Sequence, residues 1–254
     1  MRRVSEVGVA YDRAEAIGAA RSAGVGDELT TKSRFTVDSA LVRGLFAPEI
    51  RVAASPLRFD AGDLRRGERA LVRGVVEKRE REFATGRVLA RELLGEWSDP
   101  DFELLRDDDR VPRWPSDVVG SISHTAGMGE GLCVVAVSSA RNRRGVGVDV
   151  EPDEAVSEGL EASICLPSEQ AWIGGAGPDD RGRRCRVVFS IKEAVYKAFF
   201  PTVRKVWGFM EVEVEIDLGA EAFRARLPES AGQSDIEGRV LRRDGWILSG
   251  VEYP

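Results

Sequence analysis

The chain has 254 residues, of which 43% are apolar, and this is enough to fill the core of one large domain or two small ones. Its formal net charge of −6 argues against a nucleic-acid-binding protein, which normally carries a basic excess. Three cysteines without a C-x-x-C spacing support neither a disulfide framework nor a zinc cluster, and a single histidine excludes a multi-histidine metal site. The first residues lack the apolar run of a secretion signal and no window is apolar enough to span a membrane, so we expect a cytoplasmic protein.

Three parts follow one another along the chain. Residues 1–38 are rich in alanine, glycine and charge, and we interpret them as an N-terminal extension of unknown role with a helix over 12–23. Residues 39–143 form the first half of the expected folded protein, and residues 144–254 form the second half.

The first half opens with a short helix predicted over 41–46 and a strand predicted over 50–54. A long amphipathic helix is predicted over 68–95, because this stretch contains no proline and carries apolar residues four and seven positions apart. On its flank lie Arg79, Arg87 and Arg91. Spacing alone does not choose between a solvated arginine face and a functional role for them.

Three strands are predicted in the middle of the chain, over 118–124, 132–137 and 146–151. The third is predicted to return as the antiparallel partner of the second after a tight turn. The first strand ends at His124. A lone histidine is more often structural, but at the mouth of a loop it could donate a hydrogen bond to a phosphate.

The second half has helices followed by strands. Helices are predicted over 167–172 and 191–200, the latter ended by Pro201, with a basic, glycine-rich loop over 174–186 between them. Four antiparallel strands are predicted over 210–216, 223–227, 237–243 and 246–253, with a hairpin turn at 244–245. Helices and antiparallel strands in separate groups indicate an α+β fold.

Carboxylates gather in two places. Asp149 and Glu151 lie two positions apart on a predicted strand, so both point to one face, where a divalent cation would relieve their repulsion. The alternative is an exposed acidic strand end. Glu193 fits a capping box with Ser190 and an ion pair with Lys197, although a helix N-terminus also favours phosphate. Spacing alone does not decide between these interpretations.

Four segments resemble the signatures of one enzyme family. They read G-V-D-V-E at 147–151, F-S-x-K-E-A-x-Y-K at 189–197, R-x-x-x-F-x-x-G-R-x-x-A-R at 79–91 and P-x-W-P-x-x-V-V-G-S-I-S-H at 112–124. Together they resemble the 4′-phosphopantetheinyl transferases, in particular the monomeric, pseudo-dimeric branch that includes the enterobactin-synthase and surfactin-synthetase activators. The resemblance runs from about residue 40 to about residue 216.

The resemblance implies a holo-[acyl-carrier-protein] synthase. Such an enzyme transfers 4′-phosphopantetheine from coenzyme A to a serine hydroxyl of an apo carrier protein and releases 3′,5′-ADP, with Mg²⁺, or alternatively Mn²⁺, as the metal. The resemblance also implies a monomer of two similar α+β halves, related by pseudo-two-fold symmetry, with coenzyme A bound between them. Its carriers would be acyl, peptidyl or aryl carriers of fatty-acid, polyketide or nonribosomal-peptide synthesis, and neither nucleic acid nor a membrane is an expected partner.

The same resemblance assigns roles to single residues. The expected metal ligands are Asp149, Glu151 and Glu193. The expected catalytic residues are Glu193, Lys197 and Asp149, with Glu193 as the base for the carrier serine. The expected coenzyme A-binding residues are Arg79, Arg87, Ser123, His124, Lys192 and Lys197, of which the two lysines hold the diphosphate.

Two features concern partners. Segment 106–111 is unusually acidic where relatives often have a glycine-rich turn with a basic residue, and Arg110 is the candidate for that role. An acidic enzyme needs a basic docking patch for an acidic carrier, and we expect it in the segment after Glu151 up to Trp172 together with three arginines of the predicted loop. These are Arg183, Arg184 and Arg186. A solvated loop is the simplest interpretation of the same arginines.

Two other functions compete with transfer. One is a non-catalytic module that binds coenzyme A or a nucleotide, although such a module would have no need to keep repelling carboxylates together. The other is a magnesium-dependent phosphohydrolase of small phosphoesters, whose turnover would not depend on a carrier protein.

Overall fold

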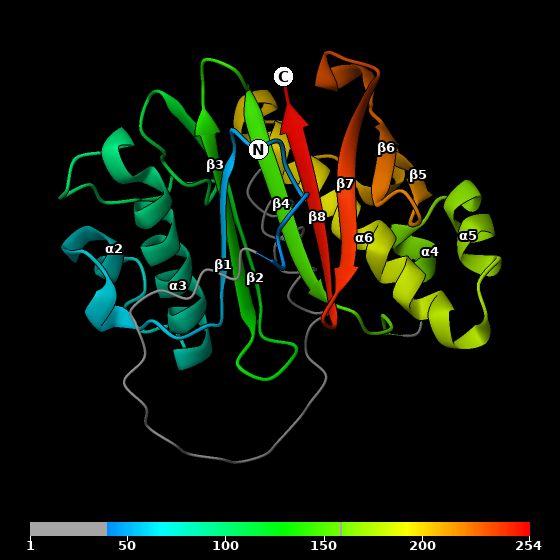
Figure 1. Cartoon of the computed structure of the whole chain (residues 1–254), viewed down its shortest axis with the longest axis horizontal. Helices are drawn as coiled ribbons and strands as arrows, with labels where there is room; N and C mark the ends of the chain where they lie inside the picture. The colour runs from blue at the N-terminus through cyan, green and yellow to red at the C-terminus, as the bar shows by residue number, and fades with distance from the viewer. Residues whose placement is uncertain (1–39, 158) are drawn as a thin grey trace, which may run out of the picture.

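The protein is described by a computed structural model over residues 40–157 and 159–254. The helix predicted over 12–23 lies outside these residues. The described chain forms two antiparallel sheets that stand side by side, each covered on one face by a long helix (Figure 1). This arrangement confirms the predicted α+β class.

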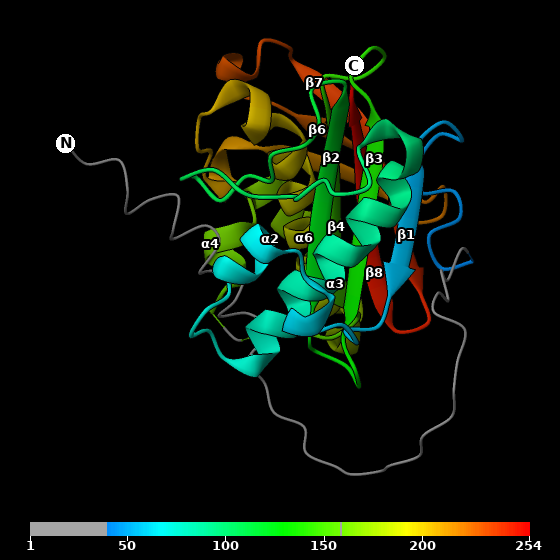
Figure 2. The same ribbon diagram turned by 90° about the vertical axis from the view of Figure 1, so that its left-hand side faces the viewer.

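The first sheet has three strands in the order β1-β3-β2. They are β1 (Arg51–Ser55), β2 (Val118–Thr125) and β3 (Leu132–Ser139). The accompanying helices are α2 (Arg66–Ala70) and α3 (Glu77–Leu94), with 3-10 turns at Ala61–Asp63 and Gly95–Trp97. Helix α3 lies across the sheet (Figure 2), where its apolar stripe of Leu89, Ala90 and Leu94 joins Val135 and Val137 of β3 in one buried cluster.

The second sheet has five strands in the order β4-β8-β7-β6-β5. They are β4 (Gly145–Pro152), β5 (Glu213–Asp217), β6 (Ala222–Arg226), β7 (Asp235–Arg243) and β8 (Trp246–Tyr253). The helices are α4 (Glu161–Ile164), α5 (Pro167–Gly174) and α6 (Pro178–Val203), with 3-10 turns at Phe209–Glu211 and Glu229–Ala231. The predicted hairpin turn between β7 and β8 is confirmed, since Asp244 and Gly245 both have the positive φ that a type I′ turn requires.

The two halves repeat one order of elements. In the first, a strand, a long helix and two further strands form a sheet in which the last strand, β3, is central. In the second, β4, α6, β7 and β8 follow the same order and β8 lies between β4 and β7, with β5 and β6 added at the far edge. The pseudo-two-fold axis itself stays a prediction.

Strands β2 and β4 join the sheets. The N–H of Val148 donates to Ser121 Oγ (3.1 Å), and the N–H of Val150 donates to Ser123 Oγ (3.3 Å). Serine hydroxyls therefore take the place that backbone carbonyls hold in a continuous sheet. A buried apolar cluster crosses the same junction and contains Leu132, Val134 and Ala136 of β3, Val146, Val148 and Val150 of β4, and Leu248 of β8.

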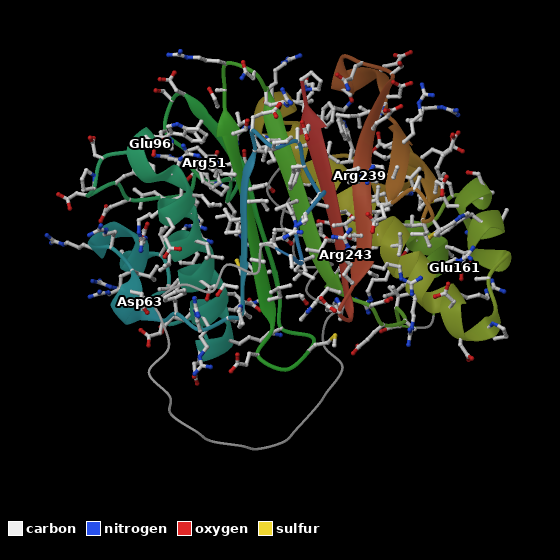
Figure 3. The ribbon with its side chains drawn as sticks, in the orientation of Figure 1. Arg51, Asp63, Glu96, Glu161, Arg239 and Arg243 are labelled. Atoms are coloured by element: carbon white, nitrogen blue, oxygen red, sulfur yellow. The ribbon has the colours of Figure 1, made fainter. Side chains whose placement is uncertain are left out.

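Residues 40–50 pack on the second sheet, on the face away from α6. The guanidinium of Arg243 donates to the carbonyl of Arg43 (2.8 Å), the N–H of Ala47 donates to Glu252 Oε1 (2.7 Å), and Leu45 joins the cluster at the junction. Arg239 and Arg243 lie along β7 on this face (Figure 3). The helix predicted over 41–46 is wrong, because these residues form turns.

Three other predicted elements are wrong. The helix predicted over 68–95 is interrupted by a turn at 71–76, where Gly74 has a φ of +79°. Strand β4 pairs with β8 and not with β3, since its remaining edge faces the serines of β2. The region predicted as a loop over 174–186 belongs mostly to α6, which begins at Pro178.

The start of α6 has a signal that the prediction missed. Proline is favoured in the first turn of a helix, and Asp179 and Asp180 complement the helix dipole there. Ser190 and Glu193 are consequently in the middle of α6, so they cannot form a capping box. Pro201 lies inside the helix near its end and does not stop it. None of the helices in the described residues is long and apolar enough to cross a membrane.

Candidate active site

Two glycines allow α6 to lie directly against β4. A Cβ added at Gly145 would lie 2.1 Å from the carbonyl oxygen of Ala198, and one added at Gly147 would lie 1.9 Å from that of Ala194. These distances are far below van der Waals contact, and the opposing atoms belong to the helix backbone. The pattern of glycine on alternate strand positions, with alanine four residues apart on the helix, therefore fixes how closely the two elements approach.

The same face of β4 continues into Asp149 and Glu151, since side chains alternate along a strand. Helix α6 carries Glu193 and Lys197 one residue before each of the two alanines that touch the glycines. Close packing of the helix on the strand thus brings Lys197 onto Asp149, with 2.6 Å between Nζ and Oδ1. Both carboxylates, Glu193 and Lys197 line one cavity.

Asp149 is the most constrained of these groups. Its Oδ1 accepts hydrogen bonds from Lys197 Nζ and from the hydroxyl of Ser123 (2.9 Å), while Lys197 also donates to Ser123 Oγ (3.0 Å). Its Oδ2 is buried and has no hydrogen-bond partner in the described structure. A buried carboxylate oxygen without a partner is costly, so this atom requires a ligand.

Glu151 and Glu193 are buried beside Asp149. Burial and, secondly, the charge of Asp149 raise the pKa of Glu151 to about 8, while Arg186 opposes the shift. Burial also raises the pKa of Glu193 to about 7; Lys197 opposes this shift and Asp149 adds to it. Both shifts arise because negative charges are held together away from water.

A hard divalent cation fits this donor set. Oxygen ligands are what Mg²⁺ prefers, and the oxygen of Asp149 that has no partner lies among carboxylates whose repulsion a cation would relieve. Among the described residues, no three acidic, histidine or cysteine side chains are already arranged around one point. Lys197 holds Oδ1 of Asp149, and Arg186 holds Oε2 of Glu151.

The cavity has a volume of about 460 Å³ and lies between the halves. Its walls come from α3, segment 106–112 and β2 of the first half, and from β4 and α6 of the second. Of the residues expected to bind coenzyme A, it is lined by Arg79, Arg87, Ser123, His124 and Lys197. A site for one ligand is therefore assembled from both sheets.

The arginines of α3 differ in their surroundings. Arg87 is buried; its Nε donates to the carbonyl of Leu104 (2.9 Å), and its guanidinium stacks 4.0 Å from the centre of the Phe83 ring. Arg79 donates to the buried carboxylate of Glu82 (2.6 Å). Both guanidiniums are held by protein contacts at the cavity wall. Arg91 is instead bound to Glu68 and does not line the cavity.

His124 is neutral at neutral pH. Burial, followed by the positive charges of Lys197, Arg79 and Arg87, lowers its pKa to about 3. Its Nδ1 lies 3.7 Å from Glu82 Oε2 and has no hydrogen-bond partner in the part of the chain that the structure describes. In the ligand-free cavity His124 is therefore neutral and can exchange a hydrogen bond with a ligand.

Segment 106–112 is held against the second half. Arg204, at the end of α6, binds Asp107 (2.6 Å) and Asp109 (3.1 Å), and Val111 joins Tyr196 in an apolar cluster. The acidity of this segment is thus explained by a partner in the other half. Arg110 lines the cavity, as the sequence interpretation requires of the basic residue in this segment, and has a φ of +66°.

Lys192 does not join the site, contrary to the expectation that it holds the diphosphate. Its ammonium group is buried and bonded to Glu169 (2.7 Å) and to the carbonyls of Ile164 (2.9 Å) and Phe209 (2.7 Å). Burial lowers its pKa, while Glu169 opposes the shift. Lys192 does not line the cavity and instead ties α6 to the α4–α5 region.

The expected arginine patch is also divided. Arg186 is buried against Glu151 and the backbone of 154–155, so it cannot dock a carrier. Arg184 lies over the ring of Trp172 and binds Asp180. Arg183 is exposed. A docking role at this surface stays a prediction for Arg183 and Arg184 alone.

Comparison with known proteins gives two family matches at different places in the chain. The model of the 4′-phosphopantetheinyl transferase N-terminal domain matches residues 67–138, and that of the 4′-phosphopantetheinyl transferase superfamily matches residues 145–246. The 4′-phosphopantetheinyl transferase Svp of Streptomyces mobaraensis is 36% identical over 193 residues, which cover 72% of this chain and 76% of Svp. The chain belongs to the 4′-phosphopantetheinyl transferase family.

Two further 4′-phosphopantetheinyl transferases support the assignment. Npt of Nocardia iowensis is 31% identical over 73% of this chain and 87% of its own length. PptT of Mycobacterium tuberculosis is 33% identical over 72% of this chain and 74% of its own length. The resemblance drawn from the four motifs is therefore confirmed, and the protein is an enzyme that transfers phosphopantetheine to carrier proteins.

Several residues that shape the transferase site were not singled out from the sequence. Gly145 and Gly147 carried a signal in their two-residue spacing before the carboxylates. Glu82 and Arg204 gave none, because their roles depend on contacts with residues far away in the chain. Arg186 was noticed only as part of a charged run.

Proposed function

We propose that the protein transfers 4′-phosphopantetheine from coenzyme A to the serine hydroxyl of an apo carrier protein in a Mg²⁺-dependent reaction that releases 3′,5′-ADP. The observation that carries the proposal is Oδ2 of Asp149, which is buried without a hydrogen-bond partner among the described residues, next to Lys197 in a cavity with walls from both halves. A cation would satisfy that oxygen, and the basic groups on the cavity wall suit an anion.

The carboxylates of Asp149, Glu151 and Glu193 would hold the cation. When bound, it would neutralise negative charge on the diphosphate and on the departing 3′,5′-ADP. Lys197, which now donates to Asp149, is the nearest basic group for the diphosphate. Arg79, Arg87 and His124 line the first-half wall and would bind the nucleotide side of coenzyme A, the arginines by charge and His124 by a hydrogen bond.

Glu193 is placed to act as the base. A pKa of about 7 lets its carboxylate accept a proton near neutral pH. The serine oxygen then forms a bond to the phosphorus that carries pantetheine. The bond from this phosphorus to the bridging oxygen breaks, and that oxygen leaves as part of 3′,5′-ADP. The proton from serine resides on Glu193 at the end of this step.

Measuring 3′,5′-ADP release with and without an apo carrier protein tests the proposal. Release that needs carrier, coenzyme A and Mg²⁺, and that stops in EDTA, is expected. Release without carrier would instead identify a phosphohydrolase. Binding of coenzyme A without release in the presence of acyl, aryl and peptidyl carriers would identify a binding module.

The setting of the reaction is part of the same proposal. The enzyme would act in the cytoplasm. It would act as a monomer, because two halves already complete one site. Its carriers would belong to fatty-acid, polyketide or nonribosomal-peptide synthesis. Size-exclusion chromatography with light scattering tests the monomer, and a dimer at assay concentration would contradict it.

A further inference from the structure

A buried arginine lies directly behind the candidate metal ligands. Arg186 of α6 has a side chain that is 4% exposed, and its Nη1 donates to Glu151 Oε2 at 2.8 Å. We propose that Arg186 is a positioning residue that fixes the carboxylate of Glu151 for a divalent cation by tying it to the segment after β4. The inference rests on the proposed function for the identity of the site.

The guanidinium uses all three of its nitrogens. Besides the bond to Glu151, Nε donates to the carbonyl of Glu154 (2.8 Å) and Nη2 donates to the carbonyl of Ala155 (3.0 Å). A planar fork with fixed directions can hold one carboxylate and two carbonyls at once. Lysine keeps the charge but cannot reproduce these directions, so it separates positioning from charge.

The segment that anchors Arg186 is itself held firmly. The N–H of Val156 donates to the carbonyl of Gly182 (3.2 Å), and a Cβ added at Gly182 would lie 2.5 Å from the Cβ of Ala155. Arg242 of β7 bridges Asp153 and Asp180, with 3.0 Å to each. The backbone carbonyls that Arg186 grips therefore have a fixed position relative to α6.

If Arg186 acted through its charge alone, its loss would change the cation affinity in the opposite direction from that expected of a positioning residue. The cavity group contains three carboxylates, and Lys197 and Arg186 are the basic side chains bonded to two of them. Removing the charge of Arg186 would make the group more negative and would strengthen attraction for a cation. Losing the fork would free Glu151 to rotate and would weaken binding, because a ligand must then be ordered when the ion binds.

The test is a titration of the full chain with Mn²⁺ in the absence of coenzyme A and carrier, in which electron paramagnetic resonance detects the bound ion. Arg186→Lys should raise the Mn²⁺ dissociation constant about tenfold, in the range seen for residues that orient metal ligands. Arg183→Lys, an exposed change on the same helix, is the matched control and should have no effect. In a Glu151→Gln background, Arg186→Lys should add nothing, since the carboxylate it positions is gone.

Mn²⁺ affinity equal to that of the unchanged protein in Arg186→Lys, or equal losses with and without Glu151, would overturn the inference. Arg186→Gln keeps an amide donor without the guanidinium fork and should show the same loss of Mn²⁺ affinity. The test needs only one of the two Arg186 variants to fold, and thermal melting in EDTA shows which of them is folded. If the protein binds Mn²⁺ through Glu151 but modifies no carrier, the proposed function fails while the role of Arg186 stands. If it binds no Mn²⁺, the role of Arg186 fails.

Discussion

Replacing Gly147 by alanine should separate the two elements that build the active site. The new Cβ would lie 1.9 Å from the carbonyl oxygen of Ala194 and 2.8 Å from the backbone nitrogen of Ala198. These are backbone atoms of α6, so no side-chain rotation can relieve the contact. The helix would have to move by about 1.5 Å to restore ordinary contact.

Both stability and activity should respond. Overpacking of a core costs roughly 1–3 kcal/mol. Contact with a helix backbone places Gly147→Ala at the upper end, about 3 kcal/mol, which corresponds to a drop of roughly 6–12 °C in melting temperature for a chain of this size. The same movement would break the 2.6 Å contact between Lys197 and Asp149, and misplacement by about 1 Å can cost about 100-fold in rate.

Thermal melting and carrier modification measure the two effects. Gly174→Ala is the matched control, because a Cβ there meets nothing within 4 Å at the end of α5. Alanine in place of a helical glycine should leave melting unchanged or raise stability by about 0.5–1 kcal/mol. A Gly147→Ala protein that melts and turns over like the unchanged protein would refute the claim that this glycine sets the position of α6.

Three more predictions concern charged groups. Lys192→Met should lower the free energy of unfolding by about 3–5 kcal/mol, because it leaves Glu169 buried without its partner. Chemical denaturation measures this loss, and the folded fraction should show only a small loss of coenzyme A affinity. An unchanged denaturation midpoint would contradict the prediction. In EDTA, the melting temperature should fall as the pH rises from about 5 to 8. The folded protein keeps the protons of Glu193 and Glu151 up to about pH 7 and 8, whereas the unfolded chain releases them near pH 4.5. A melting temperature that rises over this window would contradict the prediction. Arg204→Gln should raise the Michaelis constant for coenzyme A a few-fold and leave the rate constant unchanged, since it releases segment 106–112 at the cavity wall; an effect on the rate constant alone would exclude this role.

Local patterns predicted the site better than they predicted the elements around it. The alternation of Asp149 and Glu151 on a strand and the chemistry of Lys197 depend on near neighbours in the chain, and the structure brings all three to one cavity. The capping box of Ser190 and Glu193 was also a local pattern, but it was wrong because the helix had begun twelve residues earlier at Pro178.

Charge by itself did not show which basic residues face the ligand. Lys192 and Arg186 lie on the same helix as Lys197, yet both are buried among protein acceptors on other elements. Their partners, Glu169 and Glu151, are 23 and 35 residues away in the chain. Sequence spacing does not predict such contacts, because they depend on which strand pairs with β4 and on where α6 lies in the fold.

Intact-protein mass spectrometry of an apo carrier tests the central claim most directly. After incubation with the enzyme, coenzyme A and Mg²⁺, the carrier should gain the mass of one phosphopantetheinyl group on its serine. The gain should be absent in EDTA and with Glu193→Gln, while Arg141→Met, a change at an exposed position in the turn between β3 and β4, should leave it unchanged. A carrier that gains this mass at the full rate with Glu193→Gln would contradict the assignment of the base, and no gain with any class of carrier would contradict the proposed transfer.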